Sequence, residues 1–307
     1  MKPLHIETPL FESRALSHAS GRSIWLKLEA VQPPGSFKIR GIGLACQEYA
    51  RRGARRFISS SGGNAGIAVA YAGRTLGIPV VVVVPETTSE TARAKIQQES
   101  AEVIVHGATW DEANALASSM ITESDAFLHP FDDPLIWQGH SSVVDEIVRS
   151  GVRPAVVVLS VGGGGLLSGV IQGLHRHGWT DVPVAAVETI GADSLAQSLK
   201  AGHRITLAGI TSIATTLGAL QVCEQAFAWS TRHFLLSMVV SDRAAVSACQ
   251  RFVTDHRIVT EPACGAALAV IYDRAPEIEG YDSALVIVCG GAGVSVQQLQ
   301  RWSSELS

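Results

Sequence analysis

The feature that most constrains the fold is a set of short, unbroken apolar runs that recur along the chain. The clearest strand candidates among them are Val80–Val84, Ala155–Leu159, Val184–Val187 and Leu285–Val288. They lack the alternation of apolar and polar residues, and this pattern is typical of parallel strands that are covered on both faces. Each run is far shorter than the roughly 20 residues of a membrane-spanning helix, so we expect no membrane partner.

Alanine- and leucine-rich stretches of helical length lie between these runs. They are Asn64–Leu76, Thr91–Glu99, Asp111–Met120, Leu166–His175 and Ala244–Thr254, and Gly77 and Gly178 suit helix ends. The alternation predicts an α/β fold with helices on both faces of the sheet. A chain of 307 residues has room for about two domains. Val31–Pro34 and Pro130–Pro134 are the candidate crossings between them.

The composition disfavours several classes of protein. Hydrophobic residues make up 47% of the chain and charged residues 17%, which favours a large core over a solvated tail. The formal charge of -4 and the lack of a long basic run disfavour nucleic acid as a partner. The N-terminus has no apolar signal segment. The 5 cysteines form no C-x-x-C pair, which disfavours a zinc site or a disulfide framework, so we expect a cytoplasmic enzyme.

A run of glycines after one strand candidate carries the strongest functional signal. The strand ending at Leu159 leads into Ser160-Val161-Gly162-Gly163-Gly164-Gly165-Leu166-Leu167, and a helix follows. Without Cβ atoms in the way, the backbone N–H groups can converge at a helix N-terminus, which favours phosphate binding over an ordinary turn. The spacing fits neither the G-x-G-x-x-G pattern nor the P-loop, so dinucleotide and P-loop interpretations are weak.

A second segment, Ser59–Gly66, lies between the strand candidate at Phe57-Ile58 and a predicted helix. It offers hydroxyls, N–H groups and an amide side chain at a helix N-terminus, which suits a carboxylate. Plain N-capping by Ser61 or Asn64 explains this stretch equally well.

The third segment, Pro34–Gly41, places Lys38 among small and apolar neighbours just before a helix predicted over Ile42–Arg51. Burial there would lower the pKa of the ammonium and free a nucleophile, although a single lysine is more often a surface residue. A lysine nucleophile, a phosphate cradle and a carboxylate loop together suit pyridoxal phosphate (PLP) and an amino-acid substrate.

With these motifs the chain resembles the fold-type II PLP enzymes nearly end to end, specifically the L-serine/L-threonine dehydratases and most closely the L-serine dehydratases. The matching segments are Gly35–Gly41, Ser60–Gly66, Pro130–Pro134, Ser160–Leu167, Glu188–Ala192, Glu261–Ala266 and Cys289–Gly291. The resemblance implies two domains, each an open, twisted, mostly parallel sheet flanked by helices. Residues 1–32 and 138–307 would form the large PLP-binding domain, and residues 33–137 the small domain with the carboxylate loop.

The resemblance also implies a role for each matching residue. Lys38 would bind the cofactor covalently and abstract the Cα proton of the substrate, while Phe37 would pack on the pyridine ring. Asn64 would hydrogen-bond the 3′-oxygen of the ring, and Cys289 would face the ring nitrogen. The phosphate would be held by Gly162, Gly163, Gly164, Gly165 and Leu166, and the substrate carboxylate by Ser61, Gly62, Gly63 and Asn64. A monovalent cation, expected to be K⁺, would lie among Glu188, Ser194 and the carbonyls of Ala192, Leu217 and Ala219.

The implied reaction is a β-elimination that converts L-serine to pyruvate and ammonia, and also L-threonine to 2-oxobutanoate. A neutral thiol at the ring nitrogen does not force its protonation, which favours elimination over transamination. The resemblance further implies a homodimer.

Three alternatives stay open. Serine racemases share the fold, but relatives that racemise carry a serine where this chain has Gly62, so racemisation is disfavoured. A threonine-preferring catabolic dehydratase differs by one methyl group in its substrate, and Gly62 is expected to leave space for it. A non-catalytic protein that binds PLP or an amino acid is disfavoured because Lys38, Asn64 and Cys289 are all present.

Overall fold

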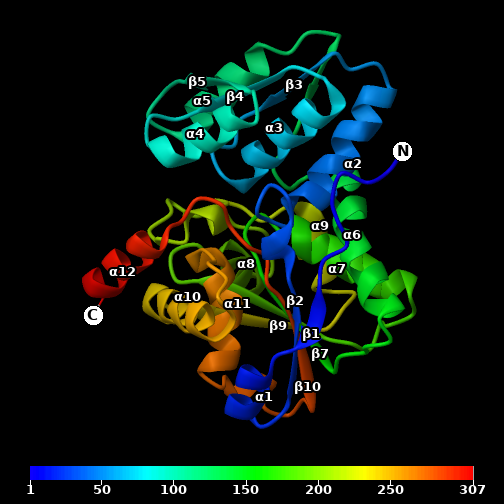
Figure 1. The fold of residues 1–307 in the computed structure, drawn as a ribbon, viewed down its shortest axis with the longest axis vertical. Helices are drawn as coiled ribbons and strands as arrows, with labels where there is room; N and C mark the ends of the chain where they lie inside the picture. The colour runs from blue at the N-terminus through cyan, green and yellow to red at the C-terminus, as the bar shows by residue number, and fades with distance from the viewer. Residues whose placement is uncertain (307) are drawn as a thin grey trace. The chain divides into compact units, whose positions relative to one another are not determined.

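The computed structural model describes residues 1–306, and the chain divides into two compact units. The small unit comprises Met1–Ile6 and Gln32–His140, and the large unit comprises Glu7–Val31 and the chain from Ser141 onward. Each unit has its own sheet with helices around it, and Figure 1 labels most of the elements of both.

The small unit contains a parallel sheet of four strands in the order β5-β4-β3-β6. Its strands are β3 (Arg56–Ser59), β4 (Val80–Val84), β5 (Glu102–Val105) and β6 (Asp125–Phe127). Its helices are α2 (Lys38–Arg51), α3 (Asn64–Leu76), α4 (Glu90–Gln98) and α5 (Trp110–Ser119), and α6 (Pro134–Arg149) begins in this unit.

Strand β4 presents apolar side chains to both faces of the sheet in the small unit, and each face is covered by a helix. All residues of β4 are buried valines, as predicted for a covered parallel strand. Val81 and Val83 form a core cluster with the alanines of α5, whereas Val80 and Val82 lie against the glycines of α3. Side chains alternate along a strand, so one unbroken valine run serves both layers.

The large unit contains a sheet of six strands in the order β1-β2-β10-β7-β8-β9. The strands are β1 (Leu10–Glu12), β2 (Ser23–Lys27), β7 (Val156–Ser160), β8 (Val184–Thr189), β9 (Leu235–Val240) and β10 (Ser283–Ile287). Only β1 runs antiparallel to its neighbour among these paired strands. The predicted fold class, two mostly parallel sheets flanked by helices, is therefore confirmed.

The helices of the large unit cover this sheet. They are α1 (Arg14–Ser20), α7 (Gly165–Arg176), α8 (Ser194–Ala201), α9 (Glu224–Trp229), α10 (Asp242–His256), α11 (Pro262–Tyr272) and α12 (Val296–Glu305). Three short 3₁₀ helices are η1 (Glu29–Val31), η2 (Thr215–Leu217) and η3 (Pro276–Ile278). Helix α11 is buried along its whole length because its sequence is apolar on every face. No helix in the described part of the chain is long and apolar enough to cross a membrane.

The division between the units differs from the sequence-based expectation at two places. Residues 1–6 group with the small unit, because the backbone of Ile6 pairs with the side chain of Gln32 and Gln47 donates to the carbonyl of Lys2. Pro130–Pro134 is not a crossing but a loop within the small unit, and the boundary falls inside α6. The crossing expected at Val31–Pro34 coincides with the boundary after Val31.

Candidate active site

Lys38 is the first residue of α2, four positions earlier than the sequence pattern indicated. The turn before the helix needs a glycine, because Gly35 has a φ of 82° and donates its N–H to the Gln32 carbonyl at 2.7 Å. The half-buried Lys38 Nζ donates to the carbonyl of Pro130 at 2.6 Å and lies 5.4 Å from the centre of the Phe37 ring. The amine is therefore anchored inside the small unit instead of extending freely into solvent.

A second lysine, Lys27, is fully buried and is a useful contrast to the half-buried Lys38. Its Nζ lies 2.5 Å from a carboxylate oxygen of Glu146 and donates to the carbonyl of Thr8 at 2.6 Å. A carboxylate partner stabilises the ammonium form, so Lys27 serves as half of a buried ion pair. Lys38 instead donates to the neutral carbonyl of Pro130 at 2.6 Å.

Two buried polar side chains near Lys38 have no hydrogen-bond partner among the described residues. His140 is fully buried with neither ring nitrogen paired, and its ring centre lies 4.9 Å from that of Phe37. The Oγ of Ser36 is also buried and unpaired. Burial, with the nearby Lys38 and Arg40, lowers the pKa of His140 well below its ordinary value, so the ring is neutral. Unpaired buried polar groups are costly, so these atoms indicate where a bound group or water completes the site.

Residues 60–63 lead from β3 into α3 in the small unit, and the sequence predicts that this loop holds the substrate carboxylate. Gly63 is the N-cap of α3, and no side chain caps the helix, so neither Ser61 nor Asn64 has the plain capping role that the sequence left open. The Gly63 N–H instead donates to the Oγ of Ser61 at 3.4 Å. The first-turn amides of α3 have no partners inside the helix, and they suit an anion such as a carboxylate.

The expected open space beside Gly62 is absent. A Cβ at Gly62 would lie 2.7 Å from both Oγ1 and Cγ2 of Thr88, in the loop before α4. The side chain of Thr88 therefore occupies the space into which a side chain at position 62 would extend. Neither the composition of the chain nor the spacing of its residues indicates this contact.

The glycine run of the large unit forms the predicted turn between β7 and α7. Gly164 is the N-cap of α7 with a φ of 90°, and a Cβ there would clash with the methyl group of Ala226. A Cβ at Gly162 would lie 3.0 Å from the Cα of Leu217, and the Gly163 carbonyl accepts from the N–H of Cys223 at 3.0 Å. The loop thus packs tightly on one side, while the first amides of the 12-residue helix α7 remain available for a phosphate.

Cys289 follows β10 in the large unit and is buried. A hydrogen bond with the thiol of Cys264, together with burial, raises the pKa of Cys289 well above its ordinary value. Gly291, with a φ of 132°, must be glycine because a Cβ would clash with the buried side chain of Glu261. Cys289 is therefore a neutral thiol held in place by the first turn of α11.

Glu188 ends the apolar part of β8 and is fully buried. Its two carboxylate oxygens accept from the N–H groups of Leu195 at 2.9 Å and Ala196 at 2.8 Å, at the start of α8. Burial nevertheless raises the pKa of Glu188 to about 8, and no basic side chain pairs with it in the described part of the chain. The carboxylate therefore sits where a cation would be stabilising. Of the other predicted ligands, Ala192, Ser194 and Leu217 are also buried.

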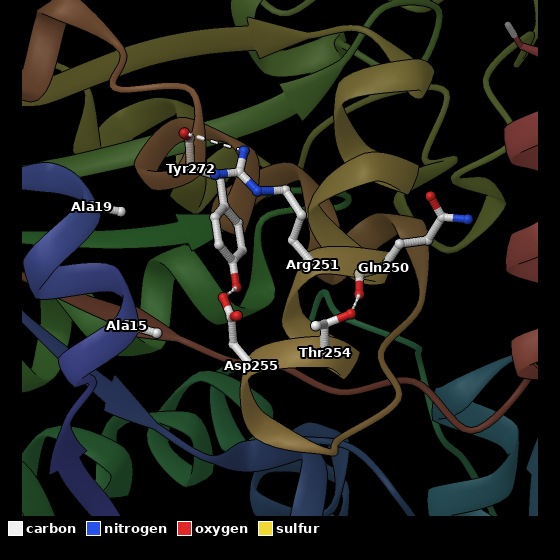
Figure 2. A pocket seen from close by; sticks show the side chains of 7 residues that line it. All are labelled: Ala15, Ala19, Gln250, Arg251, Thr254, Asp255 and Tyr272. Atoms are coloured by element: carbon white, nitrogen blue, oxygen red, sulfur yellow. Dashed lines mark hydrogen bonds between the residues drawn. The ribbon is translucent and has the colours of Figure 1, made fainter.

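A separate pocket of about 410 Å³ lies among α1, α10 and α11, and Figure 2 shows its lining. Its polar groups bind one another: the Tyr272 hydroxyl donates to Asp255 at 2.7 Å, and Arg251 lies 4.1 Å over the Tyr272 ring. It contains none of the residues predicted to hold cofactor or substrate.

The comparisons with known proteins agree with these features. The model of the family "pyridoxal-phosphate dependent enzyme" matches residues 1–290. This chain belongs to that family. It is 48% identical to the L-serine dehydratase/L-threonine deaminase of Bos taurus, over 99% of this chain and 97% of the relative. Its fold matches a fungal L-serine ammonia-lyase from Rhizomucor miehei with a TM-score of 0.95 and 32% identity over 100% of both chains. Maize serine racemase matches with a TM-score of 0.89 at 24% identity, over 99% of this chain and 93% of that one, which shows a common fold.

The residues present fit the cofactor of this family. The small unit holds Lys38, Phe37, Ser61 and Asn64, and the large unit holds the glycine run, Cys289 and Glu188. The available amides of α7 suit a phosphate, and the unpaired atoms of Ser36 and His140 near Lys38 are consistent with a polar group that binds there. Fold-type II membership, predicted from the motifs, is confirmed.

Sequence reasoning missed several side chains that shape these features. They are Ser36, Thr88, His140, Glu261 and Cys264, together with His129, whose Nδ1 accepts from the N–H of Asp132 in the loop that carries the Pro130 carbonyl. Ser36, Glu261 and Cys264 lie inside segments that carried the resemblance, and His129 directly precedes another such segment. Their places in or beside these segments could therefore have indicated that they belong to the site. His140 offered no such signal, because a histidine in an amphipathic helix is more often a core residue.

Proposed function

We propose that this protein is an L-serine dehydratase that converts L-serine to pyruvate and ammonia and also accepts L-threonine, with 2-oxobutanoate as product. The water lost in the elimination is regained when the product imine is hydrolysed. The single observation that carries the proposal is the Lys38 amine, anchored on the Pro130 carbonyl at 2.6 Å, in a chain 48% identical to a dehydratase.

In this proposal Lys38 provides both the attachment point of the cofactor and the base of the reaction. When bound, PLP supplies an electron sink that makes the Cα–H bond of an amino acid acidic. The Lys38 amine accepts the Cα proton, and the Pro130 carbonyl orients one N–H so that the lone pair stays available. The half-buried Phe37 ring, 5.4 Å from the amine, and the buried His140 ring beside it limit the access of water to the amine.

The remaining assignments follow the chemistry of each group. The amides of Gly162, Gly163, Gly164, Gly165 and Leu166 hold the phosphate, and Asn64 donates to the 3′-oxygen of the ring. Ser61 and the amides of Gly62, Gly63 and Asn64 hold the substrate carboxylate. Cys289 faces the ring nitrogen as a neutral thiol, because its pKa lies well above the physiological range. A neutral thiol does not force protonation of the ring nitrogen, and this favours elimination over transamination.

We also propose a monovalent cation, K⁺, among Glu188, Ser194 and the carbonyls of Ala192, Leu217 and Ala219. The donors are all oxygens, which suit a hard cation. Support comes from the burial of Glu188 without a basic partner in the described chain. Leu217 also adjoins Gly162 of the phosphate loop, so a cation held there would stiffen the loop.

A cytoplasmic homodimer remains part of the proposal, and the five free, buried cysteines are compatible with a reducing compartment.

The test measures 2-oxo acid formation from L-serine, L-threonine and D-serine, with and without K⁺, for the wild type and Lys38→Ala. We expect product from both L-amino acids, stimulation by K⁺ and loss of activity in the variant. Rapid accumulation of D-serine without pyruvate would instead identify a racemase. PLP absorbance without any 2-oxo acid would identify a binding protein.

A further inference from the structure

The hydrogen bond from Lys38 to Pro130 raises the question of what aims the carbonyl at the amine. Pro130 lies in the loop between β6 and α6, in the same unit as Lys38. A proline cannot donate a backbone hydrogen bond of its own, so neighbouring residues must fix its carbonyl. The 2.6 Å separation of Nζ and oxygen leaves little freedom for the loop.

His129 ties the loop together on both sides of Pro130. Its Nδ1 accepts from the backbone N–H of Asp132 at 2.8 Å and from that of Phe131 at 3.3 Å. The imidazole also packs edge-on against the Phe131 ring, with 4.7 Å between ring centres. Because Nδ1 accepts from two N–H groups, it carries no proton, and the neutral ring has its hydrogen on Nε2.

The far end of the loop is held independently of His129. The indole N–H of Trp137 donates to the Phe131 carbonyl at 2.9 Å. Asp133 accepts from the Tyr49 hydroxyl of α2 at 2.5 Å and from the N–H of Leu135 at 2.8 Å. With residues 131–133 fixed in this way, the imidazole of His129 closes the loop back across Pro130.

We propose that His129 is a positioning residue that aims the Pro130 carbonyl at Lys38 and thereby holds the amine in place while it takes up the Cα proton. The inference rests on the proposed function, because it assigns Lys38 the role of base. His129 acts through the Pro130 carbonyl and makes no contact with the substrate in this scheme.

The same geometry predicts sensitivity to the protonation of His129. A proton on Nδ1 would face two N–H donors and open the loop. Burial lowers the pKa of His129, and the charge of Lys38 acts in the same direction. Asp132 and Asp133 act in the opposite direction but less strongly than burial. The ring therefore stays neutral through the physiological range, and acid opens the loop.

The test compares four holoenzymes: wild type, His129→Asn, which keeps an acceptor oxygen, and His129→Ala and His129→Leu, which have none. His203→Ala, an exposed histidine of the large unit, is the matched control. The first measurement is kcat and KM for L-serine. The second is the pH dependence of the rate at which PLP reconstitutes the apoenzyme, which reports the neutral fraction of the Lys38 amine.

We expect the acceptor-free variants to lose about 10- to 100-fold in kcat with KM changed less than about threefold, since small misplacements of a reacting group are costly. The midpoint of their reconstitution profile should move to lower pH by roughly one unit, because the ammonium loses a carbonyl acceptor. His129→Asn should recover most of both, and His203→Ala should match the wild type.

The inference is overturned if His129→Leu retains the wild-type kcat and profile, or if His129→Asn is impaired as severely as His129→Ala. If neither acceptor-free variant folds, as judged by circular dichroism, His129 serves the fold and the positioning role is also overturned. If the wild type forms no 2-oxo acid, the proposed function fails, whereas the reconstitution profiles still decide whether His129 positions Lys38.

Discussion

Substituting Gly164 by alanine tests the glycine run that is proposed to hold the phosphate, at a position with a left-handed backbone. Gly164 has a φ of 90°, and a Cβ there would clash with Ala226 and lie 3.0 Å from Cγ2 of Val222. Gly178, at the other end of α7, offers a matched control with a φ of 73° and nothing within 4 Å of an added Cβ. The comparison separates backbone strain from close packing.

Gly164→Ala and Gly178→Ala should differ in the free energy of unfolding by the cost of close packing at Gly164. A left-handed conformation costs a non-glycine residue about 1–2 kcal/mol, so Gly178→Ala should lower the free energy of unfolding by about that amount. Gly164→Ala adds an overpacking cost of about 1–3 kcal/mol, for a total of about 2–5 kcal/mol. Relief of the clash must also displace the loop, and we expect this to remove one charge-assisted hydrogen bond to the phosphate of PLP. The Kd for PLP should therefore rise about 10- to 100-fold in Gly164→Ala but not in Gly178→Ala.

Urea unfolding of the apoenzymes and titration with PLP, followed by cofactor absorbance, measure both effects. If Gly164→Ala is no less stable than Gly178→Ala and binds PLP as the wild type does, the account of the glycine loop is refuted.

Three further predictions follow from buried groups. The Glu188 carboxyl has a pKa raised to about 8, so the native state holds its proton more tightly than the unfolded state does. Without K⁺, the stability of the wild type in thermal unfolding should therefore fall as the pH rises from about 4.5 to 8. The Glu188→Gln variant should lack this fall. Lys27→Met should cost about 3–5 kcal/mol in urea unfolding because it removes the ammonium that lies 2.5 Å from the buried Glu146 carboxylate, and an unchanged midpoint would contradict this. Gly62→Ser should destabilise the protein by about 1–3 kcal/mol through its contact with Thr88, and a double-mutant cycle should show that Thr88→Ala relieves the cost.

Much of the fold was predictable because buried parallel strands leave unbroken apolar runs. All residues of β4, β7 and β8 are buried, and each was found from its valines and alanines. Strand β9 at the sheet edge was missed because partial exposure admits a mixed sequence. The start of α2 was missed because a lysine, an arginine and a glycine fill its first turn, although Arg40 is fully buried.

The candidate site was predictable where chemistry leaves a local motif, and unpredictable where it depends on contacts across the chain. Lys38 and the glycine run stand in short, specific patterns. The filling of the space at Gly62 by Thr88 involves residues 26 positions apart, and neither residue signals the other. His129 and His140 are neutral imidazoles whose roles come from burial and from backbone donors, and these are features that no spacing encodes.

The most direct test of the central claim is to reduce the PLP-loaded protein with borohydride and map the labelled peptide by mass spectrometry. The chain has 5 lysines: Lys2, Lys27, Lys38, Lys95 and Lys200. We predict a single pyridoxyl group, on Lys38, and its loss in Lys38→Ala. A label on any of the other lysines, or none at all, would contradict the assignment of Lys38 and the mechanism built on its amine.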